Sequence, residues 1–85
     1  MEYVVVAFRS RAHTVSVSKQ LMANGIYNEI VNTPKEAGVG CGLSIKISLN
    51  QLGLVKKVIY SASIPSFAGF FLVKSMAGGR IVKTI

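Results

Sequence analysis

The sequence lacks most of the residue patterns from which metal sites, disulfides and enzyme active sites are built. It has one cysteine, Cys41, and one histidine, His13, so the chain alone can form neither a disulfide nor a site of several cysteine or histidine ligands. Only Glu2, Glu29 and Glu36 are acidic, and there is no Cys-x-x-Cys and no Gly-Lys-Ser/Thr phosphate-binding loop. We therefore expect no metal, no cofactor and no stand-alone enzyme.

Long apolar runs and blocks of like charge are also missing. Apolar runs end at Lys, Arg, Gly or Pro before the roughly 18 residues that a membrane helix needs. The start, Met1-Glu2-Tyr3, has no basic stretch ahead of an apolar run, which predicts no secretory signal and a cytoplasmic location.

The net charge of +7 comes from dispersed basic residues. It indicates either an ordinary solvated surface or attraction to nucleic acid or acidic protein faces.

What is present fits one small folded domain over residues 1–85. The hydrophobic fraction of 51% is high for 85 residues and argues against disorder. A chain this short leaves part of its apolar surface outside, which is available for a second copy or another protein.

Residue patterns predict the elements in the order β-α-β-β-α-β. Strands are expected at 3–8, 26–32, 43–49 and 67–74, and helices follow Ser10 and Asn50 as N-caps. Gly78-Gly79 predicts a hairpin turn, and 81–85 is either a short fifth strand or a frayed tail. This order predicts an α+β, ferredoxin-like domain whose antiparallel sheet carries both helices on one face.

Periodicity also predicts which side chains face the core. In the first helix these are Thr14, Val15, Ser18, Leu21 and Met22, and in the second Leu54, Val55, Val58, Ile59 and Ala62. In the third strand Leu43, Ile45, Ile47 and Leu49 alternate with Ser44, Lys46 and Ser48, which are expected to face solvent.

The predicted connectivity places the loop 33–42, with Cys41, at the end of the domain where the first helix begins. Four residues that could support a thiol cluster at that helix start: Arg9, Ser10, Arg11 and His13. The helix terminus and the arginines favour thiolate over thiol. Gly40 and Gly42 leave the sulfur unshielded, and their N–H groups could form an anion-binding nest. The alternative is that Cys41 is a small buried hydrophobic residue.

Two segments resemble a known family. Thr33-Pro34-Lys35-Glu36 and Gly40-Cys41-Gly42-Leu43, with Val5-Val6-Ala7-Phe8-Arg9-Ser10 ahead of a helix, are similar to the putative selenium/sulfur carrier protein-like family. The resemblance covers residues 3 to about 74 and leaves 75–85 outside as a hairpin or tail. It implies that Cys41 is the carrier thiol, which accepts sulfur or selenium from a donor protein as a persulfide or selenopersulfide and passes it to an acceptor protein.

Two other functions stay open from the residues alone. A binding module for RNA or an acidic protein would use the charge and the stretch 68–73, in which aromatic residues alternate with glycine. Phe67 and Phe71 are better explained as core residues, however. A structural role would use the apolar excess or an edge strand to form a homo-oligomer.

Overall fold

The chain folds into one antiparallel sheet with two helices and a long connecting loop. The computed structural model describes all residues, 1–85. Its elements are β1 (Glu2–Phe8), α1 (Arg11–Ala23), β2 (Glu29–Asn32), the 3₁₀ turn η1 (Lys35–Ala37), β3 (Leu43–Ile47), the 3₁₀ turn η2 (Leu49–Gln51), α2 (Leu52–Ala62), β4 (Phe67–Met76) and β5 (Gly79–Thr84). Neither helix is long and apolar enough to cross a membrane.

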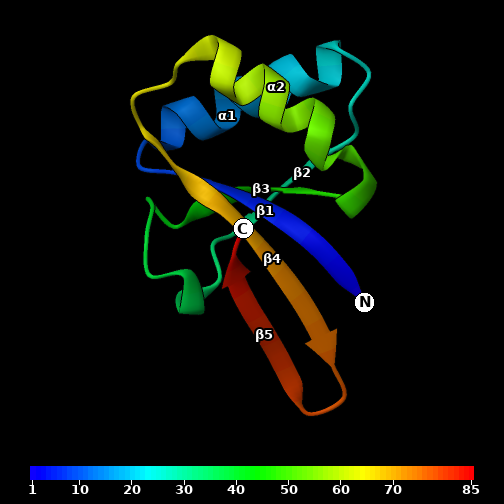
Figure 1. Ribbon diagram of the computed structural model, residues 1–85. Coiled ribbons are helices and arrows are strands. Elements are labelled where there is room, and N and C mark those ends of the chain that lie inside the picture. The colour runs from blue at the N-terminus through cyan, green and yellow to red at the C-terminus, as the bar shows by residue number, and fades with distance from the viewer.

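The strands lie in the order β2-β3-β1-β4-β5, and every neighbouring pair is antiparallel. The predicted class, α+β with two helices and an antiparallel sheet, is confirmed, and the C-terminal segment is a strand. The ferredoxin-like order is not confirmed, because β5 extends the sheet beyond β4 and the resulting order differs from the simple four-stranded plan. Figure 1 shows β4 and β5 as a hairpin that reaches away from the helices.

The central strand β1 is buried on both faces, as its unbroken apolar run predicts. Val4 to Phe8 are each 0% exposed. Val4, Val6 and Phe8 face the helices, where they meet side chains of both α1 and α2 in one core cluster. Both helices therefore cover the same face of the sheet (Figure 1).

In both helices, some residues at the edge of the apolar stripe that were predicted to face the core do not do so. In α1 the inward residues are Thr14, Val17, Ser18 and Leu21, which follow the i, i+3, i+4, i+7 spacing of a single stripe. Val15 and Met22 were predicted to be inward, and this was wrong, because they lie one position beyond that stripe and stay exposed. In α2 Leu54 and Ala62 are likewise exposed, so the prediction that they face the core was wrong, and Val55 and Ile59 fill the core.

Each helical segment begins at a side chain that caps it through a hydrogen bond. Ser10 is the N-cap of α1 and accepts a hydrogen bond from the His13 N–H, as predicted. The segment leading into α2 begins with a capping box made by Ser48 and Gln51, so the prediction of Asn50 as the cap was wrong. Ser48 and Gln51 stand three residues apart, which lets each satisfy the other's backbone N–H.

The second sheet face is covered by the loop between β2 and β3. Ala37 and Val39 of this loop pack against a buried cluster that contains Val5 and Ala7. Ser44 was predicted to face solvent, and this was wrong: it is 0% exposed, and its hydroxyl meets that of Thr33 in the loop. Leu49 was predicted to face the core, and this was also wrong: β3 ends at Ile47, and Leu49 is exposed in η2. Figure 1 shows η1 on the side of the sheet away from the helices.

Candidate functional site

The loop 33–42 is tied at both ends. The Thr33 N–H donates to the Gly42 carbonyl oxygen, with 2.9 Å between nitrogen and oxygen. The hydroxyl oxygens of Thr33 and Ser44 lie 2.7 Å apart. The Cys41 N–H donates to the carbonyl oxygen of Phe8 at 3.0 Å, which fixes the cysteine to the end of β1, directly before α1.

Glycine is required where this loop meets the strand. Gly38, Gly40 and Gly42 all have positive φ, at 65°, 95° and 94°, a region that side chains other than glycine rarely adopt. Gly40 has a second constraint, because a Cβ there would stand 3.0 Å from the Phe8 carbonyl oxygen. The backbone beside Cys41 therefore approaches β1 more closely than an alanine would allow.

The sulfur of Cys41 lies against the first turn of α1. It is half-buried, with 3.9 Å to the hydroxyl oxygen of Thr14 and 3.7 Å to the carbonyl oxygen of Leu43. Thr14 is itself 0% exposed, and its hydroxyl donates to the Ser10 carbonyl oxygen at 3.0 Å. The predicted neighbourhood, the start of the first helix, is confirmed. Cys41 belongs neither to the fully exposed residues nor to the core clusters.

The four residues expected to support the thiol, Arg9, Ser10, Arg11 and His13, stand at or just before the start of α1, and none of their side chains bonds the sulfur. Ser10 caps the helix through the His13 N–H, and the His13 ring nitrogen Nδ1 pairs with the Ser66 hydroxyl. Arg9 and Arg11 are exposed, and the Arg9 guanidinium lies 3.5 Å from a backbone oxygen of β4. None of the four has a hydrogen bond to Cys41, and their support of the thiol stays a prediction.

The polar neighbour that sequence reasoning missed is Thr14. It was assigned to the core face for its position alone, and nothing in the local pattern connects it with Cys41. A signal was present: a hydroxyl residue on a buried helix face, four residues after the N-cap, needs a hydrogen-bond partner.

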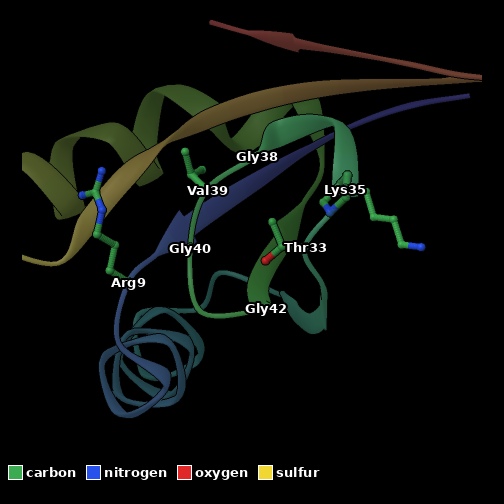
Figure 2. A pocket seen from close by; sticks show the side chains of 8 residues that line it. Arg9, Thr33, Lys35, Gly38, Val39, Gly40 and Gly42 are labelled. Carbon is green, nitrogen blue, oxygen red and sulfur yellow. The ribbon is translucent and has the colours of Figure 1, made fainter.

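An open hollow of about 670 Å³ lies beside the cysteine loop. It is lined by Arg9, Thr33, Pro34, Lys35, Gly38, Val39, Gly40 and Gly42, with no acidic residue among them. Figure 2 shows the segment from Gly38 to Gly42 as its wall, with Arg9 on one side and Lys35 on the other. The residues on either side of Cys41 belong to this wall, so the hollow and the thiol share one loop.

Comparison with known proteins gives a family for the chain. None of the curated proteins and none of the solved structures matches it. The family model described as putative Se/S carrier protein-like matches residues 3–68. The match covers most of the chain and spans β1, both helices and the whole loop around Cys41. The chain therefore belongs to the putative Se/S carrier protein-like family.

Proposed function

We propose that this chain is a sulfur or selenium carrier that holds the transferred atom on the sulfur of Cys41. The observation that carries the proposal is the position of this sulfur, half-buried beside the first turn of α1 within the region that the family model matches. Cys41 is also the only thiol of the chain. On this proposal the chain acts in the cytoplasm, where thiols stay reduced, and works with separate donor and acceptor proteins rather than as an enzyme.

The transfer is a thiol exchange that balances without an added oxidant. The Cys41 thiolate attacks the outer sulfur of a persulfide on the donor protein. The new bond joins Cys41 Sγ to that sulfur, the donor's S–S bond breaks, and the donor leaves as a thiolate. An acceptor thiolate then attacks the same outer atom and releases Cys41 as thiolate. A selenopersulfide donor passes selenium by the same two steps.

The surroundings of Cys41 would assist through charge and backbone dipoles. On this proposal, the free N–H groups at the start of α1 and the side chains of Arg9 and Arg11 stabilise the sulfur while it carries negative charge during transfer. Ser10 and His13 would act indirectly, since their hydrogen bonds hold the first turn in place. Gly40 and Gly42 leave room for the partner's sulfur.

The RNA-binding alternative receives no support from the aromatic residues of β4. Stacking of unpaired bases needs exposed rings, but Phe70 is 2% exposed and Phe71 is 6% exposed. Phe67 is half-buried and packs edge-on against Phe8. The prediction of a core position is confirmed for Phe71 and not for Phe67, which is partly buried and packs against a core cluster.

Mass spectrometry of the loaded chain tests the proposal. Incubation with a cysteine desulfurase and cysteine should add the mass of one sulfur atom to the wild type and none to Cys41→Ser. A double variant, Cys41→Ser with Ser61→Cys, places an exposed thiol on α2 and should load much more slowly. Equal loading of the moved thiol and the native one would show that any exposed cysteine reacts, and would contradict the proposal.

A further inference from the structure

The hollow beside the cysteine loop has unused hydrogen-bond donors. The N–H groups of Gly38 and Cys41 donate to carbonyl oxygens of the chain. Those of Val39, Gly40 and Gly42 donate to no acceptor within the chain. Gly40 and Gly42 are exposed and line the hollow. Val39 and Gly40 are consecutive, and consecutive N–H groups beside a residue with positive φ commonly bind an anion. The Gly42 N–H is separated from them by Cys41, whose own N–H donates to Phe8.

The cations of the hollow are unused as well. The two ion pairs of the chain join Glu2 to Lys74 and Glu36 to Arg80, which leaves Arg9 and Lys35 without a carboxylate partner. The Arg9 guanidinium makes a single long contact, 3.5 Å from Nη1 to a carbonyl oxygen, so most of its donors are free. Positive charge and open donors therefore meet in a hollow that no carboxylate lines.

We infer that this hollow binds a phosphate-bearing small ligand, with one phosphate group held by the N–H groups of Val39, Gly40 and Gly42 beside Arg9. A phosphate group of a ligand presents three terminal oxygens, each able to accept more than one hydrogen bond, so the loop N–H groups and the guanidinium can share them. Arginine pairs with phosphate through two parallel N–H···O bonds. A planar carboxylate has only two oxygens and uses fewer of these donors. Figure 2 shows Lys35 on the opposite side of the loop wall from Arg9, with its side chain extending outward. Its flexible side chain can turn toward the loop to meet a second phosphate of a longer ligand.

This site goes beyond the carrier function and does not depend on it. The side chain of Cys41 does not line the hollow, and its sulfur faces Thr14. Phosphate binding therefore survives Cys41→Ser, whereas sulfur loading does not. Each of the two proposals can fail without the other.

The test is a titration of ¹⁵N-labelled protein with inorganic phosphate, pyrophosphate and tripolyphosphate, followed by NMR at constant ionic strength. Saturable shifts should centre on the amides of Val39, Gly40 and Gly42, and affinity should rise from phosphate to the longer ions. Shifts spread evenly over the basic surface would overturn the site.

Three charge-removing variants make the test specific. Arg9→Gln should weaken binding of all three ions by about tenfold, the loss expected for a charged hydrogen-bond pair. Lys35→Gln should abolish only the advantage of the longer ions. Lys83→Gln, which removes an exposed charge from β5, should change nothing. The same affinity in Arg9→Gln as in Lys83→Gln would overturn the proposal, as would loss of binding in Cys41→Ser.

Discussion

The hydroxyl oxygen of Thr14 lies 3.9 Å from the sulfur of Cys41 and 3.0 Å from the carbonyl oxygen of Ser10, to which it donates its only proton. With a neutral thiol this arrangement is satisfied, because the S–H can donate to the Leu43 carbonyl oxygen at 3.7 Å. A thiolate has no proton to donate and needs a donor. The Thr14 hydroxyl can rotate to the sulfur, since the Ser10 carbonyl keeps the Thr14 N–H as a partner at 3.0 Å.

Replacement of Thr14 by valine should therefore slow the reaction of Cys41 with iodoacetamide at neutral pH. The change keeps the shape of the side chain and removes the donor that the thiolate needs. A hydrogen bond to a charged group contributes about 1.5–3 kcal/mol, so the alkylation rate should fall by about tenfold or more. Thr14→Ser keeps the hydroxyl and should react like the wild type. If both variants react equally, Thr14 has no part in stabilising the thiolate.

The predictable parts of the fold are the segments whose local sequence alone determines their environment. The run Val4 to Phe8 is apolar at every position, so any sheet that buries one face of it must bury the other. Ser10 is followed by a helical stripe and has no competing cap. The Ser-x-x-Gln spacing of Ser48 and Gln51 was equally readable as a capping box, but the predicted strand 43–49 extends over Ser48, and the prediction placed the cap at Asn50.

The parts that could not be predicted depend on contacts between distant segments. Alternation along β3 marks Ser44 as outward, and it does face away from the helices. It is buried only because the loop 33–42 folds over that face. The position of the loop rests on the hydrogen bond between Cys41 and Phe8, for which no local period exists. The same long-range contact brings Cys41 to Thr14. The order of the elements predicted that the loop lies at the start of α1, but it did not predict which side chain of α1 meets the sulfur.

Alanine at Gly40 should destabilise the domain more than alanine at Gly42. Both positions have φ near +95°, which costs a non-glycine residue of order 1–3 kcal/mol. Only at Gly40 does the new Cβ meet a backbone atom, the Phe8 oxygen at 3.0 Å. The difference between the unfolding free energies of the two variants, measured in urea, reports this contact, because the backbone strain is common to both. Equal losses of unfolding free energy would mean that the loop moves away from β1 at no cost.

Asn28 should be essential for the packing of the α1–β2 connection. It is 3% exposed, and its Nδ2 donates to the carbonyl oxygens of Ser18 and Ile26 at 3.2 and 3.0 Å. The Ser18 hydroxyl donates to its Oδ1. Asn28→Ala leaves buried polar groups unpaired and should lower the free energy of unfolding by about 2–3 kcal/mol.

Asn28→Asp separates hydrogen bonding from volume. The aspartate has nearly the same shape, but at neutral pH it sets a charged oxygen against two carbonyl oxygens and should be at least as destabilising as alanine. Protonation of the carboxyl group restores one donor, so part of the loss should be recovered in acid. A neutral-pH stability equal to that of the wild type would show that volume alone matters at this position.

The pair of Glu36 and Arg80 should make the stability of the loop depend on pH. Both nitrogen–oxygen distances of the pair are 2.9 Å, and the pair joins β5 to η1. The hydrogen bond from Arg80 is the main reason that the pKa of Glu36 is lowered from 4.5. A carboxyl group with a lowered pKa contributes stability above its unfolded pKa and loses it as the pH falls through the folded value.

Arg80→Gln should therefore reduce the urea midpoint near neutral pH, and the reduction should shrink as the pH falls and Glu36 becomes protonated. The reduction should be small, because both side chains are exposed, and it should shrink further in high salt. Lys83→Gln serves as the control, since it removes a positive charge from the same strand without breaking an ion pair. A loss in Arg80→Gln that persists unchanged in acid would mean that the arginine acts by packing against η1 and that its charge contributes nothing.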